Sequence, residues 1–85
     1  MFFVYVLHSL KDNKLYIGYS SDLKKRIRQH QLSNVKSTKS RLPFRLIYYE
    51  AYLLKKDAQG REKFLKGGSG HQYLHKQLKN YFQNS

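Results

Sequence analysis

Cysteine is absent from the 85 residues of this sequence. A disulfide framework and a zinc site built on thiolates are therefore both excluded. The four histidines do not replace them, because none belongs to a ligand pair with a partner cluster. The apolar segment at residues 1–7 is too short to cross a membrane and lacks the charged n-region of a signal peptide. We therefore expect one small soluble domain over residues 1–85, in the cytoplasm.

Acidic side chains are also scarce. Five Asp and Glu residues stand against seventeen Lys and Arg residues, which gives a net charge of +12. So few carboxylates exclude a two-metal site built from clustered acids. The positive excess attracts polyanions, because phosphate neutralisation dominates the non-specific binding of nucleic acids. The charge therefore favours a nucleic-acid partner, with an anionic membrane surface or a structural, ribosome-associated role as the alternatives.

The start of the chain predicts a β-hairpin. Residues 2–8 are strand formers with apolar side chains on both alternating faces, as in a strand that is covered on both sides. Asp12-Asn13 then suits a turn, and a second strand runs from Leu15 to about Tyr19. Gly18, near the end of that strand, fits either a bend or the close approach of another backbone or a ligand.

Helices alternate with one more strand after the hairpin. Ser20 or Ser21 can cap the first helix, with Asp22 in its first turn. The remaining elements are a third strand at 44–52, a helix at 55–66 that Gly67-Gly68 ends, and a last helix that a capping box of Ser69 and Gln72 starts and that buries Leu74, Leu78 and Phe82. The order β-β-α-β-α-α predicts a small α/β fold with a three-stranded antiparallel-type sheet flanked by helices. We expect the first strand at its centre.

Two segments combine positive charge with residues that can contact phosphate. In the first helix, Arg26 and His30 lie one turn apart and flank the apolar stripe of Leu23 and Ile27. A helical arginine is usually a solvated surface residue, so this placement has an ordinary explanation too. The loop at 33–43 is rich in lysine, arginine and small hydroxyl residues. Such a composition fits a phosphate-binding loop or a flexible connection.

The candidate chemistry is phosphodiester cleavage. Glu62 could hold one hard divalent cation, since Mg²⁺ is often bound by one or two carboxylates with water and substrate phosphate. Arginine stabilises phosphoryl charge through its planar donor fork, and a tyrosine can activate water when cationic neighbours lower its pKa. No serine or cysteine nucleophile with a paired base and no glycine-rich phosphate cradle stands out. Spacing alone leaves a simple binding module as the alternative.

Taken in order, these residues resemble the GIY-YIG nuclease superfamily, specifically its small stand-alone members, which are similar to the N-terminal nuclease domain of the excision-repair protein UvrC. The resemblance rests on Phe3-Val4-Tyr5-Val6-Leu7 in place of the first signature, a literal second signature at Leu15-Tyr16-Ile17-Gly18, the helix pattern through Arg26 and His30, and a late glutamate motif at Ala58, Arg61-Glu62-Lys63 and Lys66. The first signature departs from the family by having Phe3 and Val4 instead of glycine and isoleucine.

The resemblance implies metal-dependent hydrolysis of nucleic acid, DNA rather than RNA, with one Mg²⁺ or Mn²⁺ ion and no small-molecule cofactor. One of the tyrosines at 5 and 16 would activate the attacking water, and Arg26 would contact the scissile phosphate. His30 would assist proton transfer or substrate placement, and Glu62 would bind the metal. The residues expected to contact nucleic acid are Gly18, Tyr19, Lys25, Lys36, Lys39, Arg41 and Lys66.

Two alternatives accompany this prediction. The chain could be a non-catalytic basic module that keeps the fold and binds nucleic acid without turnover. Glu62 could be a structural acid, paired within its helix with Arg61 or Lys66. Many relatives also carry a late asparagine near the site, for which Asn80 is the only candidate in the last helix. No accessory DNA-reading domain accompanies the predicted domain, so specificity would come from this domain or from a partner.

Overall fold

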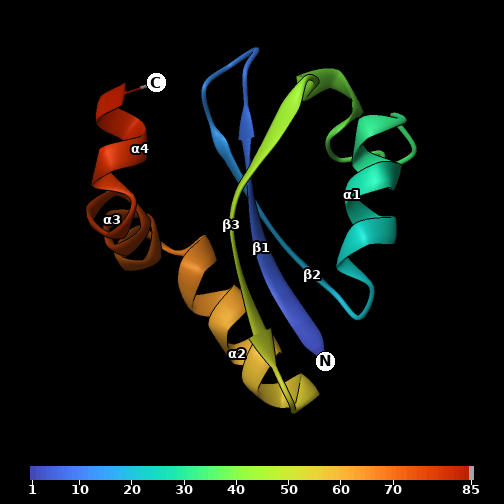
Figure 1. Ribbon diagram of the computed structural model, residues 1–85, viewed down its shortest axis with the longest axis vertical. Helices are drawn as coiled ribbons and strands as arrows, with labels where there is room; N and C mark the ends of the chain where they lie inside the picture. Colours follow the sequence, from blue (N-terminus) through green and yellow to red (C-terminus); the bar gives the residue numbers. More distant parts are fainter. Residues whose placement is uncertain (85) are drawn as a thin grey trace.

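One antiparallel sheet forms the middle layer of the protein, with β1 (Phe2–Ser9) at its centre between β2 (Leu15–Ser20) and β3 (Phe44–Tyr52). The computed structural model describes residues 1–84, and Ser85, the last residue of the predicted domain, lies outside them. The predicted element order and the central place of the first strand are both confirmed. Figure 1 shows α1 (Leu23–Gln31) on one side of the sheet and α2 (Lys55–Lys66) on the other.

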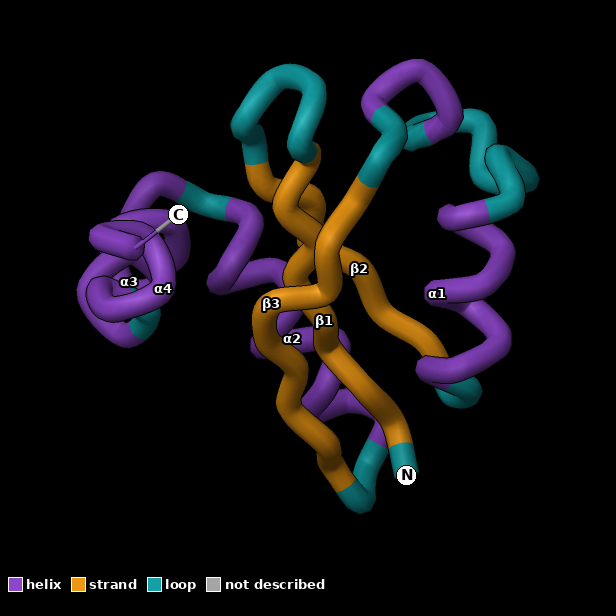
Figure 2. Tube along the Cα trace, turned by 45° about the horizontal axis from the view of Figure 1, so that its top comes forward, coloured by secondary structure: helices purple, strands orange, loops and turns teal. Residues whose placement is uncertain are grey.

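Helices on both sides explain why β1 is buried along nearly its whole length. Val4 and Val6 face α2 and pack with its Ala58 and Leu65 in the main core. The alternate side chains of β1 face α1, where Tyr5 contacts His30. The two faces of β1 therefore belong to two layers of side chains, as its uninterrupted apolar pattern predicts. Figure 2 shows the same three-layer arrangement from a second direction.

The first helix starts one residue later than the serine caps predict. Asp22 is the N-cap, and its Oδ1 accepts a hydrogen bond from the backbone N–H of Lys25 at 3.1 Å. Ser20 instead uses its hydroxyl to bridge the backbone N–H and carbonyl of Asp22. A carboxylate cap is favoured at this place because it accepts an orphan N–H and faces the positive end of the helix dipole. The prediction that Ser20 or Ser21 caps this helix is therefore wrong.

The predicted start of the last helix is also corrected. Here α3 (Gly68–Gln77) begins directly after Gly67, which caps it without a side-chain hydrogen bond, so the predicted capping box is not used. A side chain at Gly70 would overlap the backbone of Phe64 and Leu65, so its absence lets α3 cross closely over the end of α2. A break at Leu78 then separates α4 (Lys79–Asn84). None of the helices within residues 1–84 is long and apolar enough to cross a membrane.

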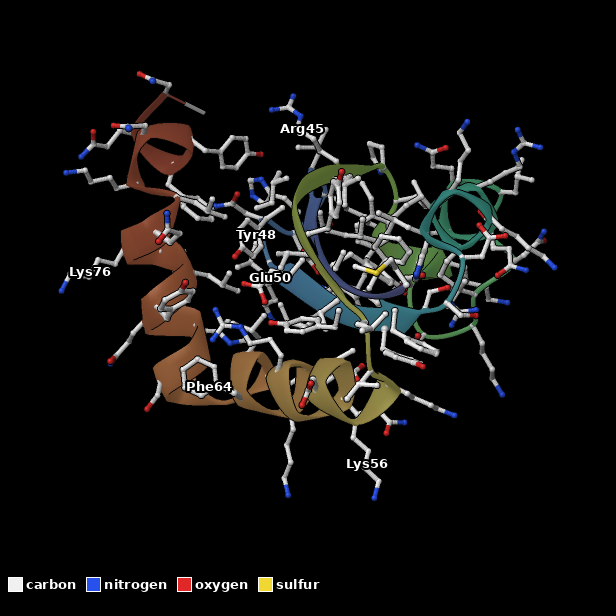
Figure 3. The ribbon with its side chains drawn as sticks, turned by 60° about the horizontal axis from the view of Figure 1, so that its bottom comes forward. Arg45, Tyr48, Glu50, Lys56, Phe64 and Lys76 are labelled. Atoms are coloured by element: carbon white, nitrogen blue, oxygen red, sulfur yellow. The ribbon has the colours of Figure 1, made fainter. Side chains whose placement is uncertain are left out.

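A carboxylate network joins β3 to α2 and α3. Arg61 donates from Nε and Nη2 to the two carboxylate oxygens of Glu50, at 2.9 and 3.0 Å, and Tyr48 and Tyr52 donate their hydroxyls to the same group. The Arg61 guanidinium also lies over the ring of Tyr73 in α3, 4.6 Å from its centroid. Figure 3 shows Tyr48 and Glu50 pointing from the strand toward these helices. The partner of Arg61 is thus Glu50 from the sheet, and not Glu62 from its own helix.

Candidate active site

The first element of the site is the close packing of Tyr5 against Gly18 across the β1–β2 ladder. The two residues are register partners, and a side chain at position 18 would overlap the Tyr5 ring. Gly18 lies inside β2 and its φ is not positive, so the predicted strand-end bend is wrong. The alternative prediction, that another group approaches Gly18 closely, is correct. That group is the ring of Tyr5 and not a ligand or another backbone. Gly18 therefore sets where the Tyr5 hydroxyl lies.

Two buried side chains hold that hydroxyl. Tyr5 Oη lies 2.8 Å from His30 Nε2, and His30 Nδ1 lies 2.7 Å from Thr38 Oγ1. Thr38 donates its own hydrogen to the Val35 carbonyl, at 3.4 Å, so its oxygen accepts from Nδ1–H of the histidine. Nε2 of His30 is then the acceptor for the Tyr5 hydroxyl. The three residues form a directed chain from Tyr5 through His30 to Thr38.

Burial sets the protonation of this chain. Tyr5, His30 and Thr38 are all fully buried. Burial raises the pKa of Tyr5 to about 12, while the hydrogen bond and positive charge of Arg26 oppose the rise. Burial also lowers the pKa of His30 to about 4, with the charge of Arg26 as the second cause. At neutral pH the pair is therefore a neutral phenol that donates to a neutral imidazole.

Tyr16 adds a second phenol to the same group. Its ring centroid lies 5.1 Å from that of His30 and 6.3 Å from that of Tyr5. The ring of Phe44 contacts His30 from another side, at 6.1 Å. Tyr16 is only half-buried, whereas Tyr5 has no exposed surface. Solvent or a ligand can therefore reach Tyr16 beside the buried chain.

Arg26 supplies the positive charge. It is half-buried on α1, and its Nη1 donates to Gln29 Oε1 at 3.2 Å. Together with Lys25 it lines an open hollow of about 540 Å³ at the junction of β2 and α1. Its charge acts on both Tyr5 and His30. Arg26 thus connects the buried chain to a surface that a phosphate can reach.

Glu62 supplies the carboxylate from the opposite layer. Its negative charge is one of the causes that raise the pKa of Tyr5, after burial and Tyr16, which brings α2 into the electrostatics of the site. Its Oε2 lies 3.2 Å from Lys66 Nζ, so the predicted helix pair forms with Lys66. Within residues 1–84, no three His, Cys, Asp or Glu side chains form a metal-binding cluster. A single carboxylate fits Mg²⁺ or Mn²⁺ only when water and phosphate oxygens complete the coordination.

The predicted nucleic-acid contacts are more dispersed. Tyr19 borders the same hollow as Arg26 and Lys25, while its ring stacks on Phe2 at 6.4 Å. Lys36 and Lys39 are exposed in the segment between α1 and β3. Arg41 is half-buried and forms an ion pair with Asp12 at 3.1 Å. The residues of the family motifs therefore lie together, whereas the basic residues of the loop at 33–43 are dispersed.

Sequence reasoning missed two residues of the site, Thr38 and Gln29. Thr38 lies in the loop that the composition identifies only as basic and polar, and its contact with His30 depends on that loop folding back onto α1. No local signal separates it from the neighbouring hydroxyl residues. Gln29 could have been found from its i+3 position relative to Arg26, because side chains at this spacing meet on a helix.

Comparison with known proteins agrees with this geometry. The family model described as "GIY-YIG catalytic domain" matches residues 1–82. A relative from Clostridium perfringens, UPF0213 protein CPE1444, is 40% identical over 67 residues, which are 78% of this chain and 71% of that protein. UPF0213 protein SpyM3_1077 from Streptococcus pyogenes serotype M3 is 42% identical over 65 residues, 75% of this chain and 70% of that one.

A solved structure agrees as well. The solution NMR structure of UPF0213 protein BH0048 from Bacillus halodurans superposes with a TM-score of 0.55 at 33% identity, covering 87% of this chain and 82% of that one. GIY-YIG domains make up a nuclease superfamily whose members typically depend on a divalent metal and act on nucleic acid. With a family match over almost its whole length and relatives of this similarity, the chain belongs to the GIY-YIG family.

Proposed function

We propose that this protein is a metal-dependent endonuclease that hydrolyses phosphodiester bonds, with DNA in the cytoplasm as its substrate. The observation that carries the proposal is the hydrogen bond from the Tyr5 hydroxyl to the neutral, buried His30, within reach of the charges of Arg26 and Glu62. A binding module needs neither a buried proton acceptor behind a phenol nor a carboxylate on a surface of strongly positive charge. A hydrolase needs both.

Arg26 would bind the scissile phosphate. Its guanidinium can donate two hydrogen bonds to phosphate oxygens, and these bonds strengthen as negative charge develops in the transition state. Lys25, which borders the same hollow, adds a second positive charge. The contact between Arg26 and Gln29 limits the rotamers of the guanidinium and holds it toward the hollow. This accounts for positioning and charge stabilisation without any covalent step.

The chain from Tyr5 to Thr38 would accept the proton of the attacking water. Because Tyr5 is fully buried, the attacking water would reach its oxygen only from the side of half-buried Tyr16. The water would give a proton to that oxygen as the Tyr5 proton passes to His30 Nε2, which leaves tyrosine neutral and histidine as the imidazolium. Thr38 holds Nδ1–H throughout. Part of the low pKa of His30 comes from Arg26. A phosphate bound to that arginine offsets its charge, so substrate binding makes His30 a stronger base.

Glu62 would hold the divalent cation, Mg²⁺ or Mn²⁺, that this family implies. When bound there, the cation would supply Lewis-acid chemistry for the oxygen that leaves the phosphate. Because the chain supplies one carboxylate at this position, the substrate itself would complete the coordination sphere. In the protein without metal, Lys66 contacts this carboxylate, with its Nζ 3.2 Å from Glu62 Oε2.

The test is a cleavage panel of single-stranded, duplex and branched DNA and RNA, with and without Mg²⁺ or Mn²⁺. We expect metal-dependent cutting by the wild type and a loss on the order of a thousandfold in Glu62→Gln, with oligonucleotide binding nearly unchanged. Asp57→Asn, which removes an exposed carboxylate from the first turn of the same helix, is the matched control and should retain activity. Binding without cleavage on every substrate would establish the non-catalytic module instead.

A further inference from the structure

A second hollow, of about 610 Å³, lies outside the site described above. It is enclosed by the turn between β1 and β2, the short 3-10 helix η1 (Lys39–Arg41) and α3. Figure 1 shows that turn at one end of the sheet, between η1 on one side and α3 with α4 on the other. The residues that line it are Asp12, Asn13, Lys14, Leu15, Arg41, His71 and His75.

Nitrogen donors dominate this lining. Lys14 is exposed, and His71 and His75 lie one helical turn apart on α3. His71 Nδ1 bonds the Gly67 carbonyl at 3.1 Å, which leaves Nε2 as the nitrogen available to a ligand. The His75 ring packs on Phe82, with centroids 4.4 Å apart, so that its orientation is fixed. Three segments that are distant in sequence thus bring an ammonium, a guanidinium and two imidazoles to one hollow.

The carboxylate in the lining, Asp12, is already neutralised. It accepts the backbone N–H of Lys14 at 2.9 Å and the Nε–H of Arg41 at 3.1 Å. These bonds, with that of the Lys14 backbone as the largest cause, hold the pKa of Asp12 below its ordinary value. Asp12 thus offsets one of the two positive charges, and Lys14 with the remaining donors of Arg41 is left to face the hollow. An anion suits this donor set, and phosphate suits its number of donors.

The hollow continues the line of the active site along β2. Leu15 belongs to its wall and receives Arg41 Nη2 on its carbonyl at 3.5 Å, and the next residue is Tyr16. Leu15 at this hollow and Tyr19 at the hollow of Arg26 are four residues apart on β2, which corresponds to about 13 Å. The Arg41 guanidinium also lies over the ring of Phe44, which contacts His30. One nucleic-acid strand can therefore span both places.

We propose that Lys14 and Arg41, in the hollow that His71 and His75 also line, bind a second backbone phosphate of the same nucleic-acid strand whose scissile phosphate lies at Arg26. This subsite rests on the proposed nuclease function for its substrate. It would hold the strand in register beside the hydrolytic site, on the side toward the β1–β2 turn. Contacts of this kind position a nucleic acid without reading its sequence.

The test measures binding and not cleavage, so that it does not depend on turnover. In the Glu62→Gln background, the affinity for a labelled single-stranded oligonucleotide is measured by fluorescence anisotropy at 50 and 200 mM salt. Losing one phosphate contact reduces the ratio between the two dissociation constants by about threefold. We expect this reduction in Lys14→Ala, because the lost contact is that of a positive charge. Lys76→Ala is the matched control, because Figure 3 shows Lys76 pointing away from the protein on α3.

A series of shortened oligonucleotides and an NMR titration then distinguish the sources of phosphate. The effect of Lys14→Ala should disappear once the strand is too short to span both sites, and the imidazole signals of His71 and His75 should shift with the long strand. Equal affinity for inorganic phosphate would identify a free-anion site and overturn the proposal. An unchanged salt dependence in Lys14→Ala would overturn it too, and this exposed substitution should not disturb folding. Failure of cleavage alone, with these binding results intact, would instead reject the proposed nuclease.

Discussion

The ring of Tyr5 occupies the space that a side chain at Gly18 would fill, so one residue of each signature fixes the other. The phenol reaches across β2 and presents its oxygen to His30. The glycine of the second signature is thus a packing requirement of the tyrosine of the first. Gly18 would therefore be required for the proposed chemistry without contacting substrate itself.

Gly18→Ala should displace the Tyr5 ring. The new methyl group overlaps a fully buried ring, and such overpacking costs about 1–3 kcal/mol of unfolding free energy. We expect this loss in urea unfolding and a larger loss of cleavage than of oligonucleotide binding. Gly60→Ala is the control, because a Cβ at position 60 meets no atom within 4 Å and alanine favours a helix interior. A Gly18→Ala protein with wild-type stability and activity would contradict the role given to this contact.

Acid should destabilise the protein through His30. Its pKa is about 4 in the folded protein against 6.5 for the free side chain, so the unfolded state binds the proton first. The stability that results is fully present above about pH 6.5 and is lost as the pH falls toward 4, a change of about 3 kcal/mol. His30→Gln, which has no titrating ring, should lose less stability over this range. If the unfolding free energies of the wild type and His30→Gln changed in parallel with pH, His30 would not be the cause of the acid destabilisation.

Thr38→Val should impair the proton relay while leaving substrate binding intact. Valine keeps the shape of threonine but cannot accept Nδ1–H of His30, so the buried imidazole loses its fixed orientation. We expect kcat to fall about tenfold or more with KM nearly unchanged, and a changed pH profile of kcat. Thr38→Ser, which retains the hydroxyl, should recover most of the activity. Equal losses in the two variants would assign Thr38 a packing role.

Sequence patterns predicted the helices and strands, and they selected the candidate site residues, because both depend on the local order of residues. The strands follow from runs of β-branched and aromatic residues, and Tyr5, Tyr16, Arg26, His30 and Glu62 follow from the spacing of the motifs. The convergence of three rings on His30 agrees with that spacing. The spacing of residues in the sequence does not specify where each side chain points once the sheet and helices have packed.

The features that escaped prediction all depend on contacts between distant segments. Thr38 reaches His30 only because the loop after α1 folds back. Gly67 caps α3 in place of the predicted Ser69, and Gly70 lets α3 cross closely over the end of α2. Arg61 pairs with Glu50, 11 positions away, because the sheet brings that acid within reach. In each case packing outweighed a reasonable local preference.

Arg61→Met should destabilise the junction of β3 with the helices. Burial alone would raise the pKa of Glu50, but hydrogen bonds from Arg61, Tyr48 and Tyr52 outweigh it and keep the pKa below its ordinary value. Removing the guanidinium leaves a charged acid whose side chain is only 17% exposed, at a cost of about 2–4 kcal/mol. The loss should shrink at acid pH, because the native pairing contributes above the ordinary carboxyl pKa and fades as Glu50 is protonated.

A double-mutant cycle with Glu50→Gln tests the pairing behind this prediction. The double variant should lose less stability than the two single variants lose together, because each single substitution leaves the other residue without its partner. Lys56→Met is the control on the same helix, where Figure 3 shows the side chain pointing away from the protein, and it should change the unfolding free energy by less than about 0.5 kcal/mol. Additive effects of the two substitutions would show that the ion pair contributes little.

Lys66 should compete with the metal for Glu62. Its Nζ lies 3.2 Å from the carboxylate while 58% of its side chain is exposed, so the pair is a surface ion pair of modest strength. Lys66→Met keeps the apolar stem and removes the charge. We expect Mn²⁺ to bind about two- to fivefold more tightly in this variant, measured by paramagnetic broadening of the NMR signals of Glu62 and Tyr5. Lys63→Met removes an exposed charge from the same helical turn without touching the pair, and it should leave the titration almost unchanged. If both variants shifted the Mn²⁺ titration equally, the effect would be one of net charge, and the specific competition at Glu62 would be wrong.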